Sequence, residues 1–377
     1  MNDLHATLAE LIRINSVNAF YTGGPGEGQL ANFVEQFFRD RGIPTHRQSV
    51  FAGRDNVIAS IAGRTPRRVI LEAHMDTVSV EGMTIPPFEP RVEAGRMYGR
   101  GACDTKAGLA AMMHAMVDLA NADQAPACEV VLAAVVDEEF SFRGVVKLCE
   151  NLTAAAALVA EPTEMRAVIA SKGVLRWRMV SRGVAAHSSK THLGINAINH
   201  MARVVLALER DHLRLAELRH PLLGAATCNV GLIAGGVQVN FVPDRCTIEI
   251  DRRLLPFEDV NDVLRHYERL LQGLRDEEPT FDVQMEPPML VDQALDTPAT
   301  APVATLASQL LGEMGLEEKL AGVPFGSDAS KLSAAGIDSI VIGPGKIDQA
   351  HAAVEYVELE QVEQASEFYR RFASNFE

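Results

Sequence analysis

The sequence has no long apolar run. Its longest uninterrupted apolar stretches, Val130–Val136 and Ala154–Ala160, are far shorter than the roughly 20 residues that a membrane-spanning helix needs. No basic segment opens the chain, and Leu4, Leu8 and Leu11 recur at helical spacing. This pattern predicts a packed first helix instead of a signal peptide, and no association with a membrane.

Cysteine pairs and positive charge are also scarce. The five cysteines include no C-x-x-C pair and are too widely spaced for a disulfide framework, so we expect a cytoplasmic protein. Lysine and arginine total 35 against 50 aspartate and glutamate residues, a net charge of −15, which gives no electrostatic support for binding nucleic acid. The acidic excess is typical of a solvated surface, although bound cations would also neutralise part of it.

Helical and strand patterns alternate over residues 1 to about 175. Helices are expected at 3–14, 29–41, 105–121 and from about 142, and strands at 57–61, 69–74, 129–136 and 158–160. Such alternation predicts a mostly parallel sheet covered by helices. The glycine-rich segment Gly23–Gly26 lacks the lysine of a phosphate-binding loop and follows no clear strand, so we interpret it as a turn.

Between about Gly173 and Pro288 the pattern changes to strand, helix, strand, strand, helix, strand. The expected elements are residues 174–181, 195–210, 228–233, 246–254, 258–274 and 281–285. This order is typical of a ferredoxin-like sandwich. A helix near 302–314 and an apolar strand at 339–343 then restore the first pattern. We therefore predict an α/β protein whose larger, mostly parallel-sheet domain (residues 1–174 and 289–377) contains an inserted ferredoxin-like domain (residues 175–288).

Acidic and imidazole side chains stand at, or shortly after, the ends of the apolar strands of the larger domain. They are His74, Asp76, Asp104, Glu138, Glu139, Glu161 and His351. Open α/β sheets form their ligand sites at the carboxyl ends of the strands. We therefore expect these side chains to meet at one edge of the sheet.

These side chains offer the nitrogen and oxygen donors that suit zinc or a similar divalent ion. Two histidines and three carboxylates (Asp104, Glu139 and Glu161) exceed the needs of one tetrahedral zinc, but they suit two ions that share a carboxylate. Taken singly, a histidine after a strand is more often a hydrogen-bonded loop residue than a ligand. Several such groups at one sheet edge favour a metal site.

Five short segments carry a resemblance to a known family. They are His74-Met75-Asp76, Gly99-Arg100-Gly101-Ala102 with Asp104 and Lys106, Asp137-Glu138-Glu139, Glu161-Pro162-Thr163, and Ala350-His351. Through them the chain resembles, over nearly its full length, the acetylornithine deacetylase, succinyl-diaminopimelate desuccinylase and glutamate carboxypeptidase family of dinuclear zinc hydrolases. Together the segments form a specific signal, whereas each alone is weak.

The resemblance implies two divalent ions per chain. One ion would bind His74 and Glu161. The other would bind Glu139 and His351, and Asp104 would bridge the two. Zinc is the expected metal, and cobalt and manganese would also accept these donors.

The resemblance also assigns roles beside the ions. Asp76 would hold the imidazole of His74 in its metal-binding orientation. Glu138 would be the general base that takes a proton from the metal-activated water and hands it to the leaving amine. The peptide bond after Asp104 would be cis.

The inserted domain has matches of its own. Ala186-His187-Ser188-Ser189 resembles the family segment whose histidine reaches the active site of the partner subunit, which implies a homodimer through this domain. His187 would then stabilise the oxyanion of the tetrahedral intermediate. The family often has a proline after this serine pair, and here Lys190 stands instead.

Four further residues resemble family positions that contact the substrate. They are Asn240, Arg253, Gly326 and Ser327. An arginine suits the α-carboxylate of an amino acid through paired hydrogen bonds. Without the resemblance, Arg253 would equally well be a residue of the sheet surface.

The resemblance implies a metal-dependent amidohydrolase that removes an acetyl or succinyl group from an N-acyl amino acid such as N-acetylornithine or N-succinyl-diaminopimelate. A dipeptidase or carboxypeptidase of the same family is the close rival. A non-catalytic ligand-binding relative is the alternative from another class, but a binding protein needs no base such as Glu138. The chain has no G-x-S-x-G elbow, so we do not expect a serine hydrolase. Cys103 has no partner histidine in any motif, so we interpret it as a turn residue.

Overall fold

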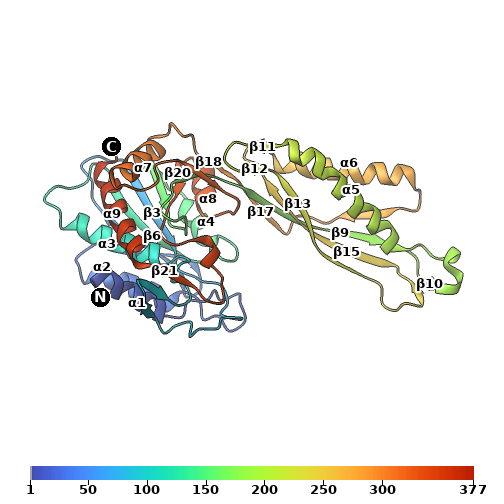
Figure 1. Ribbon diagram of the computed structural model, residues 1–377, viewed down its shortest axis with the longest axis horizontal. Coiled ribbons are helices and arrows are strands. Elements are labelled where there is room, and N and C mark those ends of the chain that lie inside the picture. The colour runs from blue at the N-terminus through green and yellow to red at the C-terminus, as the bar shows by residue number, and fades with distance from the viewer. Residues whose placement is uncertain (1) are drawn as a thin grey trace. The chain divides into compact units, whose positions relative to one another are not determined.

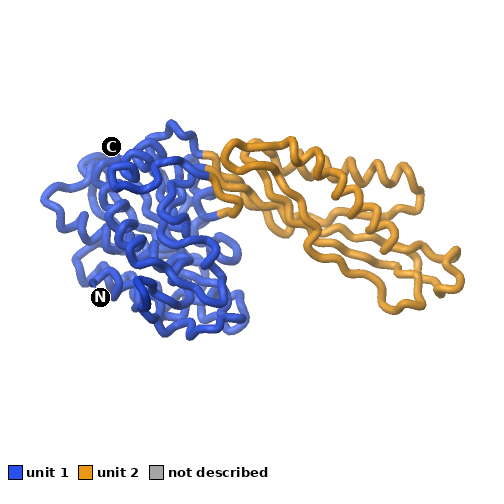
Figure 2. Tube along the Cα trace, viewed as in Figure 1, with its two compact units in different colours: residues 1–169, 297–321, 327–377 blue, residues 170–296, 322–326 orange. Residues whose placement is uncertain are grey.

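The computed structural model describes residues 2–377, and the chain divides into two compact units. The first unit contains the residues up to 169 together with 297–321 and 327–377, and the second contains 170–296 and 322–326 (Figure 2). The second unit is therefore bracketed in sequence by segments of the first.

The first unit combines helices with a central sheet (Figure 1). Its helices are α1 (Asp3–Arg13), α2 (Gly28–Arg39), α3 (Lys106–Ala120), α4 (Arg143–Cys149), α7 (Pro302–Glu313), α8 (Ala329–Ala334) and α9 (Leu359–Asn375), with the short 3₁₀ turn η2 (Ile347–Gln349). Its central strands are β1 (Thr45–Phe51), β2 (Arg54–Ile61), β3 (Arg68–His74), β6 (Glu129–Val135), β7 (Ala156–Val159) and β20 (Ser339–Val341). A small separate sheet contains β4 (Arg91–Glu93), β5 (Arg96–Tyr98) and β21 (Tyr356–Glu358).

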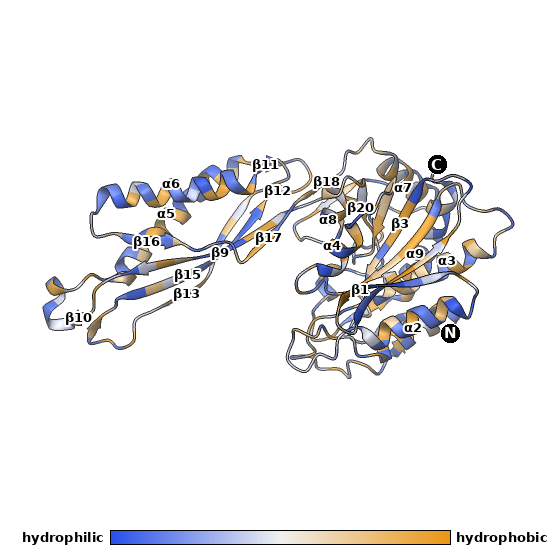
Figure 3. Ribbon diagram, turned by 180° about the vertical axis from the view of Figure 1, so that it is seen from behind, coloured by the Kyte–Doolittle hydropathy of each residue, from blue (hydrophilic) through white to orange (hydrophobic). Residues whose placement is uncertain are grey.

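The central strands follow the order β1-β2-β6-β3-β7-β20. β3 pairs in parallel with β6 and β7, and β20 pairs in parallel with β7, whereas β1 and β2 join in antiparallel pairings. Residues 69–74 of β3 are buried, as expected for a strand whose neighbours are parallel and whose two faces are both covered. Such a strand is mainly apolar, and β3 is accordingly largely orange, the colour of hydrophobic residues, in Figure 3. The predicted mostly parallel α/β sheet is confirmed.

Helices α3 and α9 pack against each other beside this sheet. α3 buries eleven of its residues, and α9 buries Phe368 and Phe372 among others. α3 is apolar almost all round, which is typical of a helix enclosed on several sides. No sequence pattern above predicts α9 or β1.

The second unit is an antiparallel sheet with two long helices. Its main elements are β9 (Gly173–Arg182), α5 (Ala197–Glu217), β13 (Thr227–Gly235), β15 (Arg245–Leu254), α6 (Val260–Glu277) and β16 (Asp282–Met285). Short elements complete it: β10 (Ala186–His187), η1 (Ser188–Leu193), β11 (Arg219–His220), β12 (Gly224–Ala225), β14 (Phe241–Val242) and β17 (Leu290–Asp292). Three more strands, β8 (Val168–Ser171), β18 (Leu295–Asp296) and β19 (Ala321–Val323), lie where the chain passes from one unit to the other.

The strand order of this sheet is β13-β15-β9-β16, and every pairing along it is antiparallel. Together with α5 and α6 this is the ferredoxin-like arrangement that the sequence predicts. The buried core includes Trp177 on β9 and Tyr267 on α6, whose ring centroids lie 5.0 Å apart, and Leu271 one turn further along α6.

Two expectations about the whole chain can be compared with the structure. All five cysteines are free thiols, as predicted. Within residues 2–377, no helix has the length and apolar character needed to cross a membrane. The expected cytoplasmic location stays a prediction.

We expect Leu271→Ala to lower the free energy of unfolding of the second unit by about 2–5 kcal/mol, because it leaves a cavity in a closed core. Trp177 is the single tryptophan of the chain, so urea titration followed by its fluorescence reports this unit. The control Leu213→Ala, at a side chain that is 79% exposed on α5, should change stability by less than about 0.5 kcal/mol. Equal effects of the two substitutions would contradict the described core.

Candidate metal centre

The register of the central sheet aligns the ends of its parallel strands. His74, the last residue of β3, stands opposite Val135 of β6, and Glu72 stands opposite Val159 of β7. The segments that follow β6 and β7 therefore begin at the same edge as His74. They carry Glu138, Glu139 and Glu161.

His74 is buried and touches two acidic residues. Its Nδ1 lies 3.0 Å from the backbone carbonyl of Asp76, and its Nε2 lies 3.1 Å from Oδ1 of Asp104. A carbonyl oxygen can only accept, so Nδ1 carries the proton and donates it to Asp76. Nε2 is then the nitrogen that faces the carboxylates and is available as a metal ligand.

Asp104 connects the two histidines. Its Oδ1 faces His74, and its Oδ2 lies 3.2 Å from Nε2 of His351. The same nitrogen of His351 lies 3.1 Å from Oε1 of Glu139. Each carboxylate oxygen of Asp104 thus faces a different imidazole, which is the arrangement of a carboxylate that bridges two sites. The Asp104–Thr105 peptide is cis, as the resemblance implies.

The donor atoms form two overlapping groups. Ligand atoms of His74, Asp104 and Glu139 lie within 4.8 Å of one another, and so do those of His74, Glu138 and Glu161. His351 joins the first group through its contacts with Asp104 and Glu139. The sequence-predicted ligands and the predicted base therefore meet in one place.

Negative charge is concentrated on carboxylates that are largely buried, whereas the side chain of His351 is 51% exposed. Burial raises the pKa of Glu138 well above its usual value, and nearby carboxylates add to the effect. Burial and the charge of Asp104 likewise raise the pKa of Glu161 well above its usual value. Hydrogen bonds to Asp104 and Glu139 raise the pKa of His351 to about 10. The site therefore favours added positive charge.

The donor set fits divalent ions. Imidazole nitrogen and carboxylate oxygen are zinc ligands, and the surplus of carboxylates calls for more positive charge than two histidines supply. A first ion would be held by His74, Glu161 and Asp104. A second ion would be held by Asp104, Glu139 and His351.

Asp76 fixes the turn that carries Glu138 and Glu139. Its Oδ1 accepts a hydrogen bond from the backbone N–H of Glu138 (3.1 Å), and its Oδ2 accepts one from that of Glu139 (3.0 Å). Its Oδ1 lies 3.5 Å from Nδ1 of His74, while its backbone carbonyl is the closer partner of that imidazole. The carboxylate therefore positions the acidic turn at least as much as it orients His74.

Glu355 holds the backbone at Asp104, and no sequence pattern above identified it. Its Oε1 accepts hydrogen bonds from the N–H groups of Cys103 (2.9 Å) and Asp104 (3.0 Å). Its Oε2 accepts from Nη1 of Arg100 at 2.6 Å, and both side chains of this ion pair are buried. Glu355 is a single glutamate four residues after His351, and it stands in no sequence motif that would indicate a role at the site. Only the tertiary contact shows its role.

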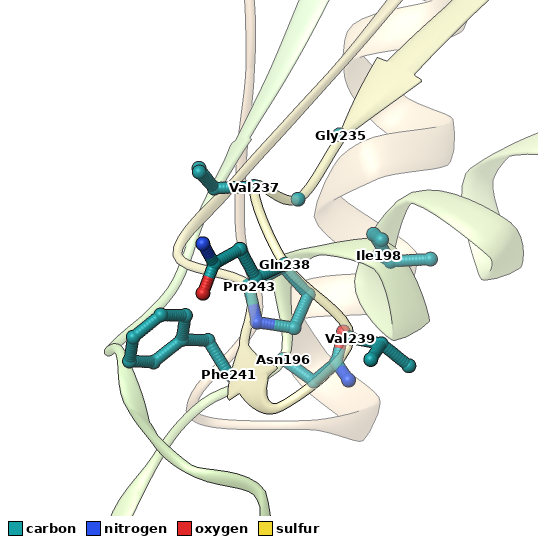
Figure 4. A pocket seen from close by; sticks show the side chains of 9 residues that line it. Asn196, Ile198, Gly235, Val237, Gln238, Val239, Phe241 and Pro243 are labelled. Carbon is teal, nitrogen blue, oxygen red and sulfur yellow. The ribbon is translucent and has the colours of Figure 1, made fainter.

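Two predicted site residues lie together in the second unit. His187 pairs with Phe241 across β10 and β14, and the N–H of Ser188 donates to the carbonyl of Asn240 at 3.0 Å. His187 is exposed, and its Nδ1 lies 2.8 Å from Oγ of Ser189. A hollow of about 410 Å³ adjoins them, and Figure 4 shows its lining, which consists of Asn196, Ile198, Gly235–Val239, Phe241 and Pro243. His187 and Asn240 are thus presented on one surface of this unit.

The other predicted substrate contacts are distributed along the chain. Arg253 lies on β15, where its Nε donates to Oδ1 of Asp251 at 2.7 Å. Ser327 is buried just before α8, and a Cβ at Gly326 would lie 2.4 Å from Oδ2 of Asp292. The close approach explains why glycine stands at position 326. The roles of these three residues towards a substrate stay predictions.

Comparison with known protein families gives one clear match. The sequence model described as Peptidase family M20/M25/M40 matches residues 70–375. An acetylornithine deacetylase from Myxococcus xanthus is 30% identical over 386 residues, covering 99% of this chain and 97% of its own length. A succinyl-diaminopimelate desuccinylase from Corynebacterium glutamicum is 28% identical over 356 residues, covering 92% of this chain and 91% of its own length.

Solved structures share the fold. Aminopeptidase PepT from Bacillus cereus superposes with a TM-score of 0.81 at 21% identity, covering 98% of this chain and 97% of its own. A dinuclear metal-binding peptidase of the M20 family from Bacillus subtilis gives a TM-score of 0.76 at 16% identity, covering 98% and 96%. At these identities the likeness concerns the fold.

We expect Glu355→Ala to lower the free energy of unfolding by about 3–5 kcal/mol, because it leaves the buried Arg100 unpaired. The control Glu358→Ala breaks the half-exposed pair with Arg96 and should cost at most about 1 kcal/mol. Chemical denaturation of the three proteins measures both values. A loss at Glu355 no larger than that at Glu358 would show that the buried pair does not hold the Asp104 segment.

Proposed function

Because the chain belongs to the M20/M25/M40 peptidase family of amide-bond hydrolases, we propose that it is a metal-dependent deacylase of N-acyl amino acids. The relatives named acetylornithine deacetylase and succinyl-diaminopimelate desuccinylase, which align over more than nine-tenths of the chain, support an acetyl or succinyl group as the acyl part. The amino acid that carries the acyl group is to be identified by the hydrolysis screen described below, because identities of 30% and 28% do not specify it.

One observation carries this proposal. The two carboxylate oxygens of Asp104 face His74 and His351 separately, and the carboxylate of Glu138 lies beside this pair. Divalent ions bound there, with zinc favoured and cobalt or manganese also acceptable, would supply the positive charge that acidifies a water molecule and polarises the amide carbonyl.

Glu138 is the residue best placed to move the proton. Burial raises the pKa of Glu138, which makes this carboxylate a stronger base than an exposed glutamate. It accepts the proton of the attacking water and delivers it to the nitrogen of the leaving amine. Asp76 keeps Glu138 in place through the backbone N–H group of that residue.

We also propose that the protein acts as a homodimer through its second unit. β13 lies at the edge of its sheet, and Leu232 and Ile233 on it are 63% and 60% exposed. An exposed apolar edge strand is a ready surface for pairing with a second copy. In such a dimer His187 would stabilise the developing oxyanion in the partner's site, a contact worth about 3 kcal/mol.

A peptidase of the same family is the second candidate function. The solved structures that share the fold include an aminopeptidase, and the residues of the centre would serve peptide hydrolysis equally well. A hydrolysis screen separates the two functions. We expect turnover of N-acetyl or N-succinyl amino acids with added zinc or cobalt to exceed that of dipeptides and tripeptides, and the reverse ranking would favour the peptidase.

Glu138→Ala should retain about two bound ions per chain while kcat falls by about 10² to 10⁴-fold, the usual contribution of a general base. Elemental analysis and steady-state kinetics on the best substrate of the screen measure the two quantities. Glu150→Ala, at an exposed glutamate after α4, is the matched control and should change neither. Unchanged kinetics of the Glu138 variant would assign the base to another group.

His187→Ala and Glu138→Ala should each be inactive alone and regain activity when unfolded and refolded together. In a random mixture half of the dimers are mixed and each holds one complete site, so about a quarter of the wild-type activity should return. Light scattering should show dimers, and Leu232→Lys should yield monomers. Dimers without any recovery of activity would contradict a shared active site.

A further inference from the structure

Asn18 lies between two carboxylates that flank the acidic turn. Its side chain is fully buried, and its Nδ2 donates to Oδ2 of Asp76 at 2.7 Å and to Oδ1 of Asp137 at 3.0 Å. An amide group has two N–H bonds, so both contacts can form at once. The donor is uncharged and therefore binds both carboxylates without the desolvation cost of a buried cation.

The two partners of Asn18 hold the same turn from both sides. Asp76 accepts the backbone N–H groups of Glu138 and Glu139, as described above. Asp137 starts the turn with a φ of 71°, a conformation that is uncommon for a residue with a side chain. Its carboxylate is directed away from the ligands, towards Asn18, Ser141 and Arg54. Asp137 therefore shapes the turn instead of binding an ion.

The network ends in a buried ion pair. Nη2 of Arg54 lies 3.2 Å from Oδ1 of Asp137 and donates to Oε1 of Glu27 at 2.6 Å, and Nε of Arg54 donates to Oε2 of Glu27 at 2.5 Å. Glu27 also accepts the N–H of Asp137 at 3.1 Å. The charge of Arg54 is therefore largely matched by Glu27. Without the amide of Asn18, Oδ2 of Asp76 would keep the N–H of Glu139 and Oδ1 of Asp137 would keep Arg54, but the two buried carboxylates would lose the donor that they share.

Asn18 is itself held firmly. Its N–H donates to the carbonyl of Thr77 at 2.9 Å, next to the isolated bridge between Val17 and Thr77. Its Oδ1 accepts from the N–H of Phe20 at 3.0 Å, which fixes the orientation of the amide. The amide nitrogen must then point at the two carboxylates.

We propose that Asn18 is a positioning residue whose amide holds the turn of Asp137, Glu138 and Glu139 in the geometry that places the base and the second metal site. The inference rests on the proposed function for the roles of Glu138 and Glu139. Its mechanical part, the hold of Asn18 on the turn, rests only on the contacts above.

The first test measures the turn itself. We expect Asn18→Leu, which keeps the size of the side chain and removes the amide, to speed hydrogen exchange of a peptide covering residues 136–142 by about tenfold. A peptide covering β15 in the second unit should exchange as in the wild type. Asn15→Ala is the matched control, because the Asn15 side chain accepts a hydrogen bond from the N–H of Val17, whereas the amide that donates to Asp76 and Asp137 is that of Asn18. Unchanged exchange in the Asn18 variant would overturn the proposal whether or not the enzyme is active.

The second test measures the consequence for the site. Titration with cobalt, followed by its visible absorption, should show one ion bound as in the wild type and the other bound about 10- to 100-fold more weakly. kcat should fall over the same range while KM stays within about twofold, since Asn18 supports the base and the ligand but not the substrate. Both ions weakened equally, or neither weakened, would reduce Asn18 to a structural residue and overturn its assignment.

Asn18→Ala keeps the proposal falsifiable if the leucine variant does not fold, and circular dichroism decides which variant is used. The two inferences fail in different ways. A wild-type protein that hydrolyses no amide in the screen contradicts the proposed function, and the hydrogen-exchange result still decides whether Asn18 holds the turn.

Discussion

The contact on which the site depends is the sharing of one carboxylate, that of Asp104, between two imidazoles. His74 approaches one oxygen and His351 the other, and Glu139 and Glu161 bring further negative charge to the same buried place. Such a concentration of acid is unfavourable in a site shielded from water unless positive charge is added. The surrounding structure supplies the restraint that keeps these groups together: Glu355 holds the backbone of Asp104, and Asp76 holds that of Glu138 and Glu139.

The part of this arrangement that sequence could predict follows from the geometry of parallel strands. β3, β6 and β7 are short, mainly apolar strands. β3 ends at His74, and β6 and β7 are followed within a few residues by Glu138 and Glu161. Parallel neighbours with a fixed register end at one edge, so residues after the strands meet there without any knowledge of loops. The ferredoxin-like order of the second unit was predictable for a similar reason, because its strands and helices are long and clearly periodic.

The supporting residues could not be predicted, because their partners are remote in the sequence. Glu355 is 251 residues from Asp104, and Asn18 is 119 residues from Asp137. Neither stands in a pattern that distinguishes it from a surface glutamate or a turn asparagine. The sequence analysis did not predict α9, which packs against α3. It also did not predict β1, whose residues are mostly polar because this strand lies at the edge of the sheet. The sequence thus reveals the ligand residues that follow periodic strands. The residues that hold those ligands in position are visible only from tertiary contacts.

The most direct measurement of the central claim is the anomalous difference map of crystals grown with zinc. The account predicts two peaks, one on each side of the Asp104 carboxylate, with His74 and Glu161 beside one and Glu139 and His351 beside the other. A single peak that Asp104 does not touch, or no peak at this edge of the sheet, would contradict it.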